Sequence, residues 1–103
     1  MSDVKFEDIQ IGDKLLYAEV LPTFGVYNLN DMHITYRYTD PEDSSKDYVS
    51  GCEKRTKQRV IFSKPFAEEV LFADRKAGLT YIKQKHEENK DVPVFKIDTD
   101  ANK

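Results

Sequence analysis

Residues 48–62 read Tyr-Val-Ser-Gly-Cys-Glu-Lys-Arg-Thr-Lys-Gln-Arg-Val-Ile-Phe, and this stretch decides the fold. Two short apolar runs, Tyr48 to Cys52 and Val60 to Phe62, flank a polar and strongly basic middle. That pattern is typical of a β-hairpin whose tip lies in water. The sequence therefore predicts a central hairpin, to which the other strands must pair.

Length and composition indicate one domain spanning all 103 residues. Charged residues make up 34% of the chain and hydrophobic residues 39%, but the apolar residues come in patterned runs, so we expect order from about Phe6 to Ile97. The polar tail, residues 98–103, has nothing to bury and is predicted to be disordered. Six Phe, six Tyr and no Trp favour strands packed with large rings.

Two strands are predicted before the hairpin. Residues 14–20 follow a Gly-Asp turn, alternate as a strand buried mostly on one side, and end before Pro22. Residues 26–38 give the clearest period of two in the chain, with a bend expected at residues 29–31. The residues expected on the inward face of this second strand are Met32, Ile34, Tyr36 and Tyr38, with His33, Thr35 and Arg37 opposite.

A helix is predicted after the hairpin. Pro65 favours a single helical turn, and residues 70–72 a short strand. Asp74 has the character of an N-cap, and residues 75–89 carry a narrow apolar stripe at helical spacing. The charged second half of this helix is expected to lie in solvent. Residues 94–97 alternate as one last short strand.

These elements predict an α+β fold. We expect a small, strongly curved antiparallel β-sheet or an SH3-like barrel of five to six short strands. One C-terminal helix, at about residues 74–89, would cap its open end.

Three segments carry a resemblance to a class of known proteins. They are Ile-Gly-Asp-Lys at 11–14, Gly-Cys-Glu-Lys-Arg-Thr-Lys-Gln-Arg-Val-Ile-Phe at 51–62, and Val-Leu-Phe-Ala-Asp-Arg-Lys-Ala-Gly-Leu at 70–79. In layout, residues 9–85 resemble small accessory proteins of phages and prophages of Gram-positive bacteria. The resemblance implies an SH3-like barrel followed by a helix, and a role in modifying or evading the host. It implies no site residue.

Charge and cysteine content limit which cellular compartment and which classes of partner we expect for this chain. The chain has a net charge of -3 and a pI near 5.4, which argues against a general nucleic-acid binder. No charged leader followed by an apolar stretch is seen, and a single cysteine excludes an internal disulfide. We therefore expect a cytoplasmic protein, in the host cytoplasm if it is phage-encoded, without membrane association.

Catalytic and metal sites are not predicted. Cys52, His33 and His86 do not form a ligand spacing, so no metal is expected. Cys52 as a nucleophile would need an aligned base and a pocket, and a strand beside a turn implies neither. Adjacent carboxylates such as Glu68 and Glu69 do not face each other. The sequence predicts a protein that is not an enzyme and carries no cofactor.

One cationic cluster is dense enough to be a binding site. We call it the basic cluster: Lys54, Arg55, Lys57 and Arg59. It could follow a phosphate backbone, with Tyr48 or Phe62 as a stacking face, or it could contact an acidic protein. Cations on hairpin edges also serve simply to block aggregation, and that reading stays open.

One acidic segment is the alternative binding surface. Residues 40–47, the acidic loop, carry four carboxylates against Lys46: Asp40, Glu42, Asp43 and Asp47. Such a cluster can imitate nucleic-acid phosphates and occupy a basic groove on a host enzyme, or it can be merely solvated.

The function predicted from these features is non-enzymatic binding. The leading hypothesis is a phage-type inhibitor or modulator of a host protein, acting by stoichiometric contact, in particular on a component of host defence. The alternatives are an SH3-like nucleic-acid-binding module that uses residues 54–59, and a structural or self-assembling phage protein such as a homodimer.

Overall fold

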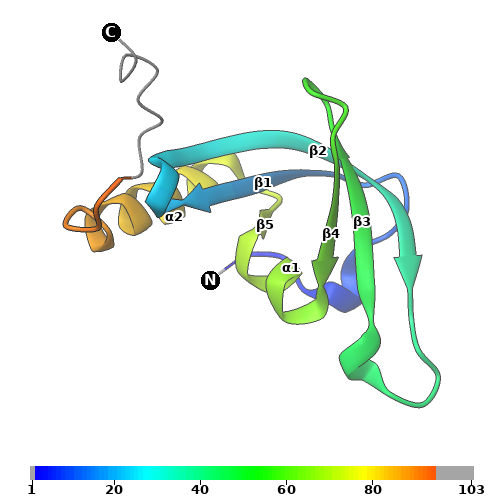
Figure 1. The fold of residues 1–103 in the computed structure, drawn as a ribbon. Coiled ribbons are helices and arrows are strands. Elements are labelled where there is room, and N and C mark those ends of the chain that lie inside the picture. Colours follow the sequence, from blue (N-terminus) through cyan, green and yellow to red (C-terminus); the bar gives the residue numbers. More distant parts are fainter. Residues whose placement is uncertain (1, 95–103) are drawn as a thin grey trace, which may run out of the picture.

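The computed structural model describes residues 2–94, which form one antiparallel sheet with two helices and three short 3-10 turns (Figure 1). The strands are β1 (Lys14–Leu21), β2 (Val26–Tyr38), β3 (Tyr48–Glu53), β4 (Arg59–Ser63) and β5 (Leu71–Phe72). The helices are α1 (Lys64–Val70) and α2 (Arg75–Glu88), and the 3-10 turns are η1 (Phe6–Asp8), η2 (Pro22–Phe24) and η3 (Ser44–Lys46). The predicted strand at residues 94–97 and the tail at 98–103 lie largely outside the described residues.

The strand order is β4-β3-β2-β1-β5, and the sheet is open. The α+β class and the curved antiparallel sheet are confirmed, whereas a closed barrel is wrong. The predicted hairpin exists as β3 and β4 but lies at the edge, and β2 takes the centre. β2 can do so because its thirteen residues pair with β1 along the first part and with β3 along the second. Figure 1 shows β2 curving from one to the other.

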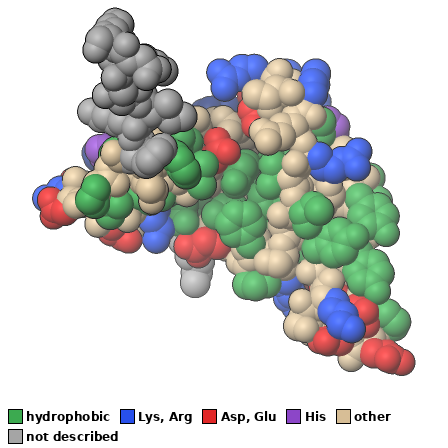
Figure 2. Space-filling view, in the orientation of Figure 1, with side chains coloured by type: hydrophobic (Ala, Val, Ile, Leu, Met, Phe, Trp, Pro, Cys, Tyr) green, Lys and Arg blue, Asp and Glu red, His purple; other side chains and the backbone are tan. Residues whose placement is uncertain are grey.

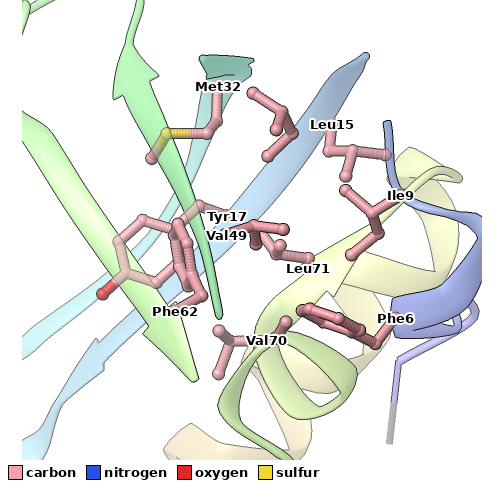
Figure 3. Packing of buried hydrophobic residues seen from close by; sticks show 11 residues of the cluster. Phe6, Ile9, Leu15, Tyr17, Met32, Val49, Phe62, Val70 and Leu71 are labelled. Carbon is pink, nitrogen blue, oxygen red and sulfur yellow. The ribbon is translucent and has the colours of Figure 1, made fainter. Parts of the chain in front are cut away.

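The main core lies on the sheet face covered by α1 and η1, which we call the inner face (Figure 3). Phe6 from η1, Tyr17 from β1 and Phe62 from β4 meet there with Ala67 and other residues of α1. The rings of Tyr17 and Phe62 pack edge to face, with centroids 5.1 Å apart. Burial of such rings is the largest apolar contribution to stability in a domain of this size.

A second, smaller core lies on the opposite, outer face, where α2 covers β1, β5 and the first part of β2. Leu16 and Ala18 pack there against Phe72 and Tyr81. β1 is therefore buried on both faces, and the prediction of a strand buried mostly on one side is wrong. Alternate residues of one strand point to opposite faces, so α1 and α2 each take one set.

A β-bulge at Thr35 divides β2. Ile34 pairs with Gly51 and Tyr36 pairs with Ser50, which leaves Thr35 as an extra residue. Because a bulge shifts the alternation by one, the side chains that follow it change faces. Ile34 is buried on the inner face, but Tyr36 is 48% exposed on the outer face. The predicted inward set was therefore wrong beyond Ile34, and the irregularity lies at residue 35 rather than at 29–31.

Arg37 takes the inward place that Tyr36 vacates. Its guanidinium lies over the Phe6 ring, 4.4 Å from the centroid, and donates to the carbonyls of Phe6 at 2.7 Å and Ile9 at 2.5 Å. These contacts hold η1 against the sheet.

Side-chain caps begin both helices. Asp74 accepts from the N–H of Ala77 at 3.1 Å and caps α2, as predicted. Ser63 caps α1, which runs to seven residues rather than the single predicted turn, so the described residues contain two helices instead of one. Gly78 lets α2 lie close to β2, because a Cβ there would come within 2.8 Å of Leu29.

In the part of the chain described here, neither helix has the length and apolar character needed to cross a membrane.

Candidate protein-binding face

Among residues 2–94, no helix covers the outer face over β3, β4 and the end of β2. Its central residues, which we call the tyrosine face, are Tyr36, Tyr38, Tyr48, Ser50, Arg59 and Ile61. Figure 2 shows hydrophobic side chains gathered over β3 and the end of β2, at the right of the view. α2 ends its cover at β1, β5 and the start of β2, so this half of the sheet presents side chains to solvent.

The three tyrosines of this face contact one another. The Tyr38 ring stacks on the Tyr48 ring with centroids 5.5 Å apart, and the Tyr36 ring lies tilted 5.9 Å from the same Tyr48 ring. Tyr38 and Tyr48 are direct cross-strand neighbours, a position in which aromatic pairs stabilise a sheet. The rings therefore form one ordered aromatic surface rather than three independent side chains.

A shallow depression of about 360 Å³ lies within this face. It is lined by Thr35, Tyr36, Tyr48, Ser50, Arg59 and Ile61. Ser50 lies at its floor, because its neighbours across the strands are the larger Tyr36 and Ile61. Among the buried side-chain nitrogen and oxygen atoms of the described residues, the Ser50 hydroxyl oxygen is the one without a hydrogen-bond partner. A buried hydroxyl in that state costs about 1–3 kcal/mol.

The tyrosine face includes only one member of the basic cluster. Arg59 pairs with Cys52 and lies beside Tyr36 and Tyr48 in the depression. Of the two predicted stacking rings, Tyr48 is on this face, but Phe62 is fully buried in the inner core. The prediction for Phe62 is wrong because β4 alternates, and the side chain that neighbours it on the outer face is Ile61.

Lys54 lies at a different site. It lines an open cleft of about 510 Å³ together with Lys14, His33 and Arg75. The carboxylate in this cleft, Asp31, pairs with Arg75 at 3.4 Å, and both side chains are exposed. Lys57, at the hairpin tip, adopts a positive φ of 63°, which residues other than Gly and Asn rarely do. The structure thus spreads the basic cluster around the hairpin instead of bringing it onto one face.

The acidic loop uses most of its carboxylates internally. Asp47 is buried and accepts from the N–H of Asp40 at 2.8 Å. Asp40 accepts from the N–H groups of Glu42 and Asp43, each at 2.9 Å. Asp43 in turn caps η3 by accepting from Ser45. Three of the four carboxylates therefore fix the shape of the loop, and an acidic decoy role stays a prediction that must be tested without deforming it.

These bonds also set the acidity of the loop. The pKa of Asp40 is lowered by the Glu42 N–H first, then by the Tyr38 hydroxyl and the Asp43 N–H. Hydrogen bonds from Ser45 lower the pKa of Asp43. Conversely, the hydrogen bond to Asp40 raises the pKa of Tyr38. The loop carries its negative charge at one end of the tyrosine face, opposite the end at which Arg59 lies.

Cys52 and His33 are cross-strand neighbours, which sequence reasoning did not find. The Cys52 Sγ lies 3.5 Å from the Lys57 carbonyl and 3.8 Å from that of Glu53, both weak contacts to main chain. His86 lies on α2, away from this pair, and packs against the Tyr27 ring of β2. Within residues 2–94, no group of three or more His, Cys, Asp or Glu side chains is placed to hold a metal ion.

Comparisons with models of protein families, with curated proteins and with solved structures give no match for this chain. The resemblance to phage accessory proteins therefore stays a prediction, and a functional proposal has to be argued from the surface itself.

Proposed function

We propose that this chain is a non-enzymatic binding protein that contacts a protein partner through the tyrosine face. The observation that carries the proposal is the buried hydroxyl of Ser50, without a hydrogen-bond partner at the floor of a depression walled by Tyr36 and Tyr48. A polar group of a partner that enters between the rings would satisfy this hydroxyl. The cost of leaving it unsatisfied in the free protein would then be regained on binding.

The composition of the face supports a protein partner. Tyr and Arg are enriched at the centres of protein–protein interfaces, where they fill pockets and supply most of the binding energy. Here Tyr36 and Ile61 are 48% and 65% exposed, although each is large and apolar enough to be buried in a core. The rings are already stacked, so little side-chain entropy remains to be lost when a partner binds.

The charges at the two ends of the face specify the partner's chemistry. Arg59 lies toward the hairpin end, and the acidic loop lies beyond Tyr38 at the other end. A complementary partner presents an apolar or aromatic centre, an acidic group toward Arg59 and a cation toward Asp40. Within this proposal, the resemblance to phage accessory proteins favours the role of a phage-type inhibitor or modulator of a host protein. On the same resemblance, we propose that the arrangement of the strands is SH3-like.

The test is capture from host lysate followed by direct binding to the captured protein. Tyr36→Ala and Tyr48→Ala should each weaken binding by at least about 30-fold, the loss that marks an interface hot spot. Leu79→Ala is the matched control, because Leu79 is 51% exposed on α2, away from this face, and should leave affinity unchanged. Equal binding by all variants would overturn the tyrosine face as the contact surface.

Single-stranded nucleic acid is the second candidate for the same face. The observation in its favour is Arg59 beside the rings of Tyr36 and Tyr48, since stacked bases and a neighbouring cation are the usual elements of such sites. Against it stands the acidic loop, which would repel phosphates. In a gel-shift titration against salt, Arg59→Gln would lower the slope by about one unit if this candidate were correct. The protein-partner proposal expects no shifted band.

A further inference from the structure

The outer edge of β4 has main-chain groups that the sheet does not use. Two bonds fix the pattern of the β3–β4 ladder: Glu53 N–H to the Gln58 carbonyl at 2.8 Å, and Lys64 N–H to the Asp47 carbonyl at 3.2 Å. With the observed register, β4 residues with even numbers bond to β3, and those with odd numbers point away from it. The N–H and C=O of Arg59 and Ile61 therefore face the free edge.

This edge has one feature that opposes strand pairing, the cation Arg59 at its start, and lacks the others. Natural edge strands are blunted by a central Lys, a Pro or a bulge, or they are covered by another segment. β4 has Ile61 at its centre, 65% exposed, and its register with β3 is regular. No second strand pairs with β4 in the described part of the chain. An unprotected apolar edge strand is a template for another strand.

We propose that a second copy of this chain pairs with the β4 edge in antiparallel fashion about a two-fold axis at Ile61. In this register Ile61 lies opposite Ile61 of the second copy, and the two residues exchange both main-chain hydrogen bonds. Arg59 then lies opposite Ser63 of the second copy. The exposed side chains of the two Ile61 residues become a cross-strand pair.

Charge favours a second copy over an unrelated strand. β4 runs from the basic cluster to the end of the sheet at which the acidic loop lies. An antiparallel two-fold pairing brings the basic cluster of each copy toward the acidic loop of the other. The cluster carries four cations, whereas residues 40–47 carry four carboxylates and Lys46. A surface with opposite charges at its two ends is complementary to itself under such an axis.

The pairing would also join the two tyrosine faces. Side chains of Arg59 and Ile61 lie on the outer face, and a continuous sheet places both sets of tyrosines on one side. A partner with two copies of its own epitope would then bind with avidity. The dimer does not depend on the proposed function, because it uses main chain at an edge rather than the rings on the face.

The experiment measures the mass of the full chain in solution by sedimentation over a range of concentrations. The parent should form a concentration-dependent dimer that weakens with added salt. Ile61→Lys should raise the dimer dissociation constant by at least about 30-fold, as loss of a central contact does. Leu79→Lys adds the same charge at an exposed apolar residue of α2 and should leave the dimer intact. Tyr36→Ala should also stay dimeric, which separates this proposal from the partner-binding one.

Hydrogen exchange gives a second readout. In the dimer the Ile61 amide should be protected at high protein concentration and should lose protection on dilution, while the Val60 and Phe62 amides stay protected throughout. A parent that is monomeric at every concentration, or an Ile61→Lys variant that dimerises like the parent, would overturn the proposal.

Discussion

The hydroxyl of Tyr38 donates a hydrogen bond to Asp40 across 2.9 Å. This bond links the tyrosine face to the acidic loop, because the ring of Tyr38 stacks on the face while Asp40 organises the loop backbone. The position of the Tyr38 ring and the charge of Asp40 are therefore coupled at that end of the tyrosine face.

The first prediction concerns this coupling. In Tyr38→Phe the pKa of Asp40 should rise toward its ordinary value, because the phenol no longer donates to the carboxylate. It should stay below that value, since the Glu42 N–H has the larger effect. Carboxyl carbon NMR over a pH titration measures the change. Asp43, which is held by Ser45, is the internal control and should titrate as in the parent.

The second prediction concerns the bulge. Ile34→Ala should lower the free energy of unfolding by about 2–5 kcal/mol, because Ile34 is 1% exposed in the inner core. Tyr36→Ala should cost less than about 1 kcal/mol, because its ring lies on the solvent side. Urea unfolding with a common slope compares the two. Comparable losses would mean that Tyr36 is buried and that residue 35 does not shift the alternation.

The third prediction concerns the start of α2. Asp74→Ala should destabilise the protein by about 1 kcal/mol, because the N–H of Ala77 loses its acceptor. Glu88→Ala removes only an exposed ion pair with Lys85 and should change stability by less than about 0.5 kcal/mol. Thermal melts of the two variants beside the parent test the difference, and equal effects would contradict the capping role.

The fourth prediction concerns the close approach of β3 to β2 at Gly51. An alanine Cβ at residue 51 would lie 2.6 Å from Sδ of Met32, which is itself buried. Gly51→Ala should therefore cost about 1–3 kcal/mol through overpacking. In a Met32→Ala background the same change should cost less, because the clashing atoms are gone. Strict additivity of the two substitutions would show that Gly51 is required for another reason.

The fifth prediction concerns alkaline pH. Burial, followed by the hydrogen bond to Glu69, raises the pKa of Tyr81 to about 12. In the unfolded chain the pKa of a tyrosine is about 10. The unfolded state therefore loses its proton first, and the stability that the neutral phenol contributes is present below pH 10 and declines as pH rises toward 12. Tyr81→Phe should flatten this decline, and parallel pH profiles would contradict it.

The sequence predicted local elements well where one local signal decided them. The hairpin of residues 48–63 followed from two apolar runs around a polar tip, and the start of α2 followed from Asp74. Both depend on neighbours in sequence. β1 was misjudged for the opposite reason, since only the packing of α1 and α2 on opposite sides of the sheet buries both of its faces.

The candidate site was not predictable in the same way. Tyr36 and Tyr38 continue the alternation of Met32 and Ile34, so the pattern alone places all four inside. The one signal that could have warned of the bulge is Arg37, whose contacts with Phe6 and Ile9 come from residues about thirty positions away. The basic cluster and the acidic loop were recognised as charge runs, but their hydrogen bonds and the faces they occupy depend on strand register.

The bulge at Thr35 makes the identity of the exposed surface a matter of strand register. Substitutions at Tyr36 or Tyr38 would change this surface one side chain at a time. Deletion of the single residue Thr35 would make Ile34–Gly51 and Tyr36–Ser50 consecutive pairs, so Tyr36 and Tyr38 would stay on the outer face and Arg37 would stay on Phe6. If Thr35 itself paired with Ser50 and no bulge formed, Tyr36 and Tyr38 would turn toward the core, and the same amino acids would present an entirely different surface to a partner.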